Sequence, residues 1–290
     1  MLRFLLIVAL CGMSLFLALA QDVPTHPPYP TRIRNVVYRT RAPIPVVDKN
    51  EAARRLRHVA NTSHPSLGLE ETRGMAQEYA RALLEDHGYW KASIETRLLP
   101  LPQRAGWVDV VFQIDEGAQY YLSRISWTSV KEFTDSDLHD AMAIRSGEVA
   151  SRGRISQGLQ EVNKLYASRG YINCVLIPDT KLDDASHAMA LNILVDEGAQ
   201  FHFGELDLPG LDAEHREMLL QRWQAIKGTT YSFKKEEGFF RSVLWPADPK
   251  QRGYNYWFYR EFIDTRLDER EHAMNFSIRF APPPPVWKIQ

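Results

Sequence analysis

The pentapeptide Asp-Glu-Gly-Ala-Gln occurs twice in the chain, at residues 115–119 and 196–200, and an aromatic residue follows it both times. Other marks recur at the same spacing. Gly-Tyr pairs begin at residues 88, 170 and 253, and the related segments ETRL, DTKL and DTRL occupy residues 95–98, 179–182 and 264–267. A fixed order of marks at a fixed period predicts three copies of one structural unit of roughly 80 residues.

Each copy has the same sequence of expected elements. A strand is expected at 32–40, 120–130 and 201–208, and a short helix follows at 47–60, 135–144 and 212–226. A longer helix comes next, and it ends at the Gly-Tyr pair. Glycine at that place is typical of a left-handed residue just after a helix. The helix-end turns are therefore predicted at Gly88-Tyr89, Gly170-Tyr171 and Gly253-Tyr254, with the tyrosines in the core.

Two strands complete the unit, and the second of them, VDVVFQI or AMALNILV, is apolar throughout. A strand of this kind is expected in the centre of its sheet. The fold class is therefore α+β, with three tandem β-α-α-β-β modules. Each is a three-stranded mixed sheet with two helices on one face. Glycine permits a tight exit from a strand, so the predicted joints between modules are Glu116-Gly117 and Glu197-Gly198.

The ends of the chain are expected to lie outside the modules. Residues 1–21 have a basic start, an apolar run and a small-x-small cleavage site, which is typical of a secretory signal peptide. The prolines of residues 22–31 and 282–290 predict a stiff leader and a stiff tail. The modules then occupy 32–119, 120–200 and a divergent 201–281, and the signal peptide predicts that the protein is exported.

The composition gives little support to an enzyme, a metalloprotein or a nucleic-acid-binding protein. After cleavage, Cys174 is the single cysteine, and 36 acidic residues face 34 basic ones once Arg3 is removed. Glycine-rich phosphate-binding motifs and a Gly-x-Ser-x-Gly motif are missing. His187 and His272 recur in register, and solvated turns explain them better than metal binding. We expect no catalytic residue, metal or cofactor, and no nucleic acid partner.

The module pattern resembles the POTRA (polypeptide-transport-associated) domain. The residues that carry this resemblance are Gly88-Tyr89 with VFQIDEGAQY and Gly170-Tyr171 with NILVDEGAQF. Tandem copies resemble the periplasmic arms of BamA- and TamA-type outer-membrane assembly factors. With the signal peptide, the resemblance implies a protein of the periplasm or of the periplasmic face of the outer membrane. The third copy departs from the pattern, because Pro246 and Pro249 precede its Gly-Tyr pair and it lacks Glu-Gly. The residues after the third copy are too few for a β-barrel, so we expect a POTRA-only protein or a chain cut short before its barrel.

The resemblance implies binding at the strand that follows the second helix. In the family this strand is an open edge, where a polypeptide can pair by β-augmentation. Here it corresponds to 89–98, 171–182 and 255–267, and the implied edge residues are Ile94, Thr96, Ile172, Cys174, Val175, Tyr256 and Phe258. The expected partners are unfolded outer-membrane or secreted polypeptides, or an assembly-machine protein through which the chain could associate with the outer membrane. The alternative is a structural spacer or partner-docking module that binds no client.

Overall fold

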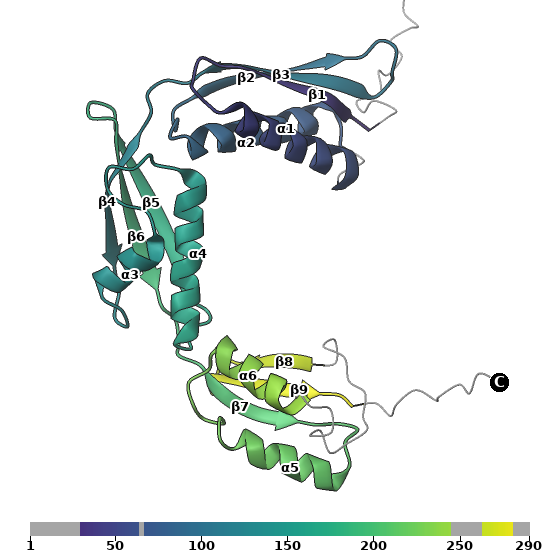
Figure 1. The fold of residues 1–290 in the computed structure, drawn as a ribbon, viewed down its shortest axis with the longest axis vertical. Helices are drawn as coiled ribbons and strands as arrows, with labels where there is room; N and C mark the ends of the chain where they lie inside the picture. The colour runs from purple at the N-terminus through teal and green to yellow at the C-terminus, as the bar shows by residue number, and fades with distance from the viewer. Residues whose placement is uncertain (1–29, 64–66, 245–262, 281–290) are drawn as a thin grey trace, which may run out of the picture. The chain divides into compact units, whose positions relative to one another are not determined.

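The computed structural model describes residues 30–63, 67–244 and 263–280 (Figure 1). The predicted signal peptide and the Pro-rich tail lie outside these residues, as do nearly all of the Pro-rich leader, Gly253, Tyr254 and the aromatic stretch around Tyr256 and Phe258. The chain divides into two compact units, residues 1–119 and 120–290. The first unit contains one module and the second contains two.

The first module consists of β1 (Arg32–Arg39), α1 (Val46–His58), α2 (Leu69–Asp86), β2 (Ser93–Pro100) and β3 (Trp107–Asp115). A π-helical turn, η1 (Val59–Ser63), follows α1. The strand order is β1-β3-β2, with β1 parallel and β2 antiparallel to the central β3. Both helices cover the same face of the sheet (Figure 1). The predicted β-α-α-β-β order is therefore confirmed here.

The second module repeats this arrangement with β4 (Tyr121–Thr128), α3 (Asp135–Met142), α4 (Arg152–Ser168), β5 (Val175–Asp183) and β6 (Ala188–Asp196). The strand order is β4-β6-β5, again with the last strand in the middle. Thr134 begins α3 with a complete capping box, in which its side chain and that of Asp137 each accept from the other's backbone N–H.

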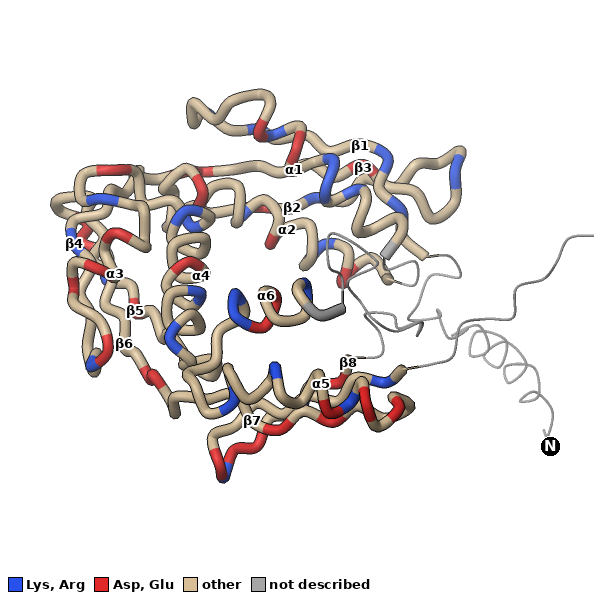
Figure 2. Tube along the Cα trace, turned by 60° about the horizontal axis from the view of Figure 1, so that its bottom comes forward, with Lys and Arg blue, Asp and Glu red and all other residues tan. Residues whose placement is uncertain are grey.

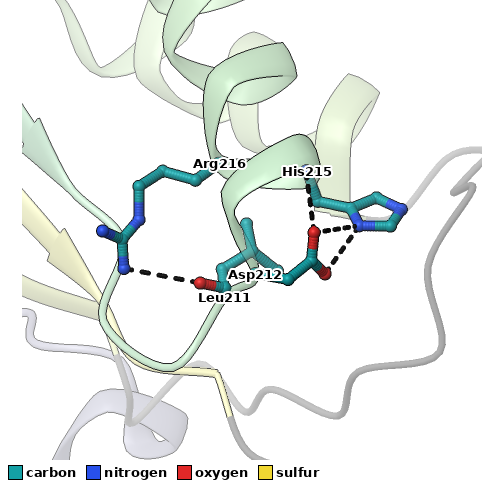
Figure 3. Close-up of polar contacts among 4 residues, drawn as sticks. All are labelled: Leu211, Asp212, His215 and Arg216. Atoms are coloured by element: carbon teal, nitrogen blue, oxygen red, sulfur yellow. Dashed lines mark hydrogen bonds and ion pairs between the residues drawn. The ribbon is translucent and has the colours of Figure 1, made fainter.

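The third module has β7 (His202–Asp207), α5 (Ala213–Trp223), α6 (Phe233–Leu244), β8 (Ile263–Asp268) and β9 (Ala273–Ile278), in the order β7-β9-β8. Asp212 begins α5 by accepting from the backbone N–H of His215, and its carboxylate also contacts the His215 ring (Figure 3). Arg216 donates back to the carbonyl of Leu211. The third copy therefore folds as a module although its sequence diverges.

The core of each module lies between the helices and the central strand. On β6, Met189, Leu191, Ile193 and Val195 are buried at alternate positions, as the period of a strand requires. Each fully buried side chain of this kind contributes roughly 1.5–3 kcal/mol relative to leaving it exposed. In the third module the core is largely aromatic, and Phe203, Trp223 and Phe276 contact one another there. The apolar last strands were thus correctly predicted to be central.

The predicted turn glycines that lie in the described residues have positive φ angles. Gly88 and Gly170 have φ of 80° and 87°, and the joint glycines Gly117 and Gly198 have φ of 65° and 68°. His187 and His272 also have positive φ, in the exposed turns before β6 and β9. The carbonyl of His187 accepts from the N–H of Tyr121, and that of His272 accepts from the N–H of His202.

Charged residues of both signs are interspersed along the described chain, as on α4 (Figure 2). None of the helices in the described residues is both long and apolar enough to cross a membrane.

The packing of α4 generates a prediction about two helical glycines. A Cβ atom added at Gly158 would lie 2.5 Å from the carbonyl oxygen of Met142 on α3, whereas one added at Gly238 in α6 would meet nothing within 4 Å. Gly158→Ala should therefore destabilise its module by about 1–3 kcal/mol. The matched control Gly238→Ala should stabilise by about 0.5–1 kcal/mol, because glycine is a poor helix former. Urea unfolding of both variants tests this, and equal effects would contradict it.

Candidate functional site

The candidate site is the set of sheet edges. In each module the central strand is paired on both sides, so the first and second strands each leave a row of backbone N–H and C=O groups without a strand partner. Such a row is a template for an added strand unless something covers it. The two edges of each sheet differ in how they are covered.

In the second module, the loop before α4 covers the start of the first strand. The N–H of Leu122 donates to the carbonyl of Glu148 at 2.8 Å, and the N–H of Gly147 donates to the carbonyl of Leu122 at 2.7 Å. Ala150 then donates to the carbonyl of Tyr120 at 3.0 Å. This antiparallel pairing gives the start of β4 a partner on its outer side.

The third module repeats the arrangement. The N–H of Phe203 donates to the carbonyl of Thr229 at 2.9 Å, and the N–H of Gly228 donates to the carbonyl of Phe203 at 2.7 Å. Tyr231 donates to Phe201 at 2.9 Å, as Ala150 does to Tyr120. The same edge is therefore covered by the same segment of the module.

The first module reaches the same result with a side chain. The amide of Asn61, in η1, accepts from the N–H of Ile33 at 2.9 Å and donates to the carbonyl of Ile33 at 3.0 Å. Ile33 occupies the place that Leu122 and Phe203 hold in the other two modules. A carboxamide carries one acceptor and one donor group in the arrangement that a paired backbone would offer. Asn61 thus substitutes for a strand at this edge.

The second strand of the first module has an edge that no described backbone segment pairs with. The N–H of Leu101, just after β2, donates inward to the carbonyl of Trp107. Residues of an antiparallel strand alternate in the side to which their backbone groups point. The register of β2 is unbroken, so Ile94, Thr96 and Leu98 direct their N–H and C=O groups outward. No backbone bond of the described residues joins these outward groups to another segment.

The second strand of the second module is an edge with an interruption. Pro178 lies in the middle of β5 opposite Ile193, without any shift of register. Proline cannot donate to a ladder, so in a sheet its nitrogen faces away from the partner strand. The even-numbered residues of β5 therefore direct their backbone N–H and C=O groups away from β6. Pro178 leaves this outward row without its middle N–H donor.

Three of the predicted edge residues lie on edge strands. Ile94 and Thr96 are on β2, and their side chains face the helices. Ile94 is half-buried and Thr96 is buried. Val175 is on β5 and is about half exposed. Their role in partner binding stays a prediction.

The prediction that Ile172 and Cys174 belong to the edge strand is wrong. Both precede β5, in a turn where Cys174 N–H donates to the carbonyl of Tyr171, and Ile172 packs against the core of the third module. Tyr256 and Phe258 lie outside the described residues. Burial, followed by the charges of Glu197 and Asp196, raises the pKa of the Cys174 thiol to about 11.

The joints have a role that the sequence did not reveal. The carboxylate of Glu197 is buried and accepts from the backbone N–H groups of Lys131 and Glu132 at 2.8 and 2.9 Å, and from the Tyr166 hydroxyl at 3.1 Å. It thereby fixes the loop that leaves β4. Glu116 does the same for the loop after β1, where it accepts from the N–H of Ala42 at 2.9 Å and from Thr40 and Arg41.

These hydrogen bonds set the charge of both carboxylates. Burial alone would raise the pKa of Glu116, but the hydrogen bonds from Thr40 and the backbone outweigh it and lower that pKa to about 2. The pKa of Glu197 is also lowered, because its backbone and tyrosine donors outweigh its burial. Both groups are therefore carboxylates near neutral pH, each held by donors that suit a negative charge.

The glutamine of the repeated pentapeptide completes the joint. The side-chain amide of Gln119 donates to the carbonyl of His87 at 2.8 Å, and that of Gln200 donates to the carbonyl of Arg169 at 2.9 Å. Each acceptor is the residue just before a helix-end glycine. The glutamate thus holds the module's first loop, the glycine makes the turn, and the glutamine holds the end of the second helix.

Among the described residues, no group of three or more His, Cys, Asp or Glu side chains is arranged to hold a metal ion. What the geometry does offer is backbone hydrogen-bonding capacity at β2 and β5.

Comparisons with known proteins agree with this architecture. Residues 120–198 match the POTRA family, described as a surface antigen variable number repeat. The chain is 28% identical over 215 residues to a provisionally named outer membrane protein assembly factor of Treponema pallidum (strain Nichols), covering 70% of this chain and 24% of that protein. It is 19% identical over 160 residues to the outer membrane protein assembly factor BamA of Buchnera aphidicola, covering 55% of this chain and 26% of BamA.

The chain spans about a quarter of the length of both curated relatives. Among solved structures it is similar to POTRA3-5 of Haemophilus influenzae BamA, with a TM-score of 0.52 and 16% identity, over 86% of this chain and 96% of that one. This similarity shows a shared fold.

The joint generates a prediction about Glu197. Glu197→Ala should destabilise the second module by about 2–3 kcal/mol, because two backbone N–H groups and a hydroxyl lose a charged acceptor. Amide exchange at Lys131 and Glu132 should accelerate correspondingly. Asp179→Ala removes an exposed carboxylate of the same module and should change stability by less than about 0.5 kcal/mol. Unchanged exchange at residues 131–132 in Glu197→Ala would refute this role.

Glu116 generates a prediction about pH. Its pKa is about 2 in the folded protein against an ordinary 4.5, so the unfolded chain binds a proton first as the pH falls. The stabilisation is therefore complete above about pH 4.5 and is lost between about pH 4.5 and 2. Because the group is partly solvated, we expect a loss of about 1–2 kcal/mol. Thermal unfolding across this range should show a shallower pH dependence for Glu116→Gln than for the wild type.

Proposed function

We propose that this tandem array, of which residues 120–198 match the POTRA family, acts in the periplasm as a non-enzymatic scaffold in outer-membrane protein assembly. In this role it binds extended polypeptide segments, from unfolded outer-membrane clients or from a partner of the assembly machinery. The bound segment is added as a further strand beside the second strand of a module. The observation that carries the proposal is a difference between the two edges. Backbone or carboxamide groups cover the start of the first strand in all three modules, whereas no backbone bond among the described residues covers the outward row of β2.

Backbone pairing suits a protein that handles many clients. The hydrogen bonds come from main-chain groups that every client has, and side chains at alternate positions adjust the preference. The uncovered part of β2 presents Ile94, Thr96 and Leu98, whose outward groups span about 14 Å from the first to the last residue at the rise of an antiparallel strand. A client segment of five or more residues is enough to satisfy them.

The alternative is a structural spacer, or a docking module for one folded partner, that binds no client. The two functions differ in an accessible property. A scaffold binds unfolded polypeptide at β2 or β5, whereas a spacer leaves those edges empty in the presence of unfolded outer-membrane protein.

The test is site-specific cross-linking with the mature chain, residues 22–290. A photoreactive benzoylphenylalanine replaces Glu95 on β2 or Lys181 on β5, both of which are exposed. The control position is Asn163, which is exposed on α4. Each variant is irradiated with a small, urea-unfolded outer-membrane protein that has just been diluted into buffer.

We expect adducts at position 95 or 181 and few at position 163. Adducts at none of the three positions, or equal yields at all three, would overturn edge binding and favour the spacer. A folded water-soluble protein in place of the unfolded client should give no adduct at any position.

A further inference from the structure

We infer that β2 of the first module, rather than β5 of the second, is the strand that accepts the added segment, and that this segment alternates apolar and polar residues. The inference rests on the proposed function and assigns it to one edge. It compares β2 and β5 because the structure describes both of these strands together with the residues that precede them.

The first argument is the number of consecutive donors. β2 presents outward N–H groups at Ile94, Thr96 and Leu98, and Pro100 ends the row. The corresponding row in β5, 82 residues further along, is Leu176, Pro178 and Thr180. Pro178 therefore stands where Thr96 stands in β2. It removes the middle donor and places a ring where an added strand would lie. Proline on an edge strand is a recognised protection against strand addition.

The second argument is the character of the two faces beside each edge. On β2, the helix-facing Ile94 and Leu98 pack against the core, while the outer-facing Glu95 and Arg97 are exposed and form an ion pair at 2.8 Å. An added strand continues both faces of the sheet. Its apolar residues would lie beside Ile94 and Leu98, and its polar residues beside Glu95 and Arg97.

The β5 edge has a different distribution. Pro178 and Thr180 on the row that faces the helices are exposed, while Val175 and Ile177 on the outer face are apolar and half exposed. The apolar side chains of an alternating segment would therefore lie beside partly buried apolar side chains along β2. Over the middle of β5 they would lie beside the exposed Pro178 and Thr180 instead. Transmembrane strands of outer-membrane proteins alternate apolar and polar residues in this way, so they are the class of segment that β2 fits.

Three single substitutions separate the contribution of the backbone N–H from that of the Thr96 side chain. Thr96→Pro gives β2 the interruption that β5 has, and it sacrifices no bond to β3 because the N–H of Thr96 faces outward. Thr96→Val is the matched control. It keeps the N–H and the shape, and the Thr96 hydroxyl is buried without a hydrogen-bond partner among the described residues. Pro178→Thr is the reciprocal change, which restores the missing donor to β5.

The probe is a fluorescein-labelled ten-residue peptide of alternating valine and threonine with a lysine at each end, titrated into residues 22–290 and followed by fluorescence anisotropy. We expect Thr96→Pro to weaken binding at least tenfold and Thr96→Val to stay within twofold of the wild type. Pro178→Thr should add one peptide site per chain to the number that the wild type has. This gain does not depend on whether the Thr96→Pro variant folds.

Different results would reject the assignment to β2 and the proposed edge binding. If the wild type binds the peptide while Thr96→Pro binds equally well and Pro178→Thr gains nothing, the assignment to β2 is wrong and edge binding stands. An equal loss in Thr96→Val and Thr96→Pro would also overturn it, because the side chain would then be responsible. If the wild type binds neither the peptide nor unfolded outer-membrane protein, the proposed function fails as well.

Discussion

The structure depends on the hydrogen-bonding requirement of backbone groups at the edges of a three-stranded sheet. The central strand is satisfied on both sides, so each module has two edges. The loop before the second helix closes the start of the first strand in the second and third modules, and Asn61 closes it in the first. Three different local sequences reach the same outcome, which indicates that closing this edge is a requirement of the module.

The repeated pentapeptide, which follows the last strand, holds two other parts of the module in place. Glu116 and Glu197 fix the loop after the first strand, and Gln119 and Gln200 fix the end of the second helix. These contacts are charge-assisted or made to backbone groups, so they hold positions more strongly than exposed ion pairs do. In the third module, β9 is followed instead by Phe280, whose N–H donates to the carbonyl of Pro209. The loop after β7 is thus held without a glutamate.

Much of the fold could be predicted from the sequence because it depends on periodicity and on special backbone angles. The 81-residue offset, the apolar last strands and the glycines at 88, 117, 170 and 198 identify the modules and their turns. The edge closure could not be predicted, because backbone pairing by residues 147–150 or 228–231 has no side-chain signature. The misplaced start of β5 has a similar cause. The segment YINC is mostly apolar and runs into the apolar residues of β5, but its backbone turns at Cys174 before the ladder begins.

The difference between the two edges is tested most directly by the amide exchange of the free mature chain, read residue by residue by NMR and corrected for intrinsic rates. We expect slow exchange at Ile33, Leu122 and Phe203, whose N–H groups are bonded on the outer side of the first strands. We expect fast exchange at Ile94, Thr96 and Leu98 on β2, beside slowly exchanging Glu95 and Arg97. Equal protection at Ile33 and at the three outward residues of β2, or an inverted alternation along β2, would contradict a closed start of the first strand beside an open second strand.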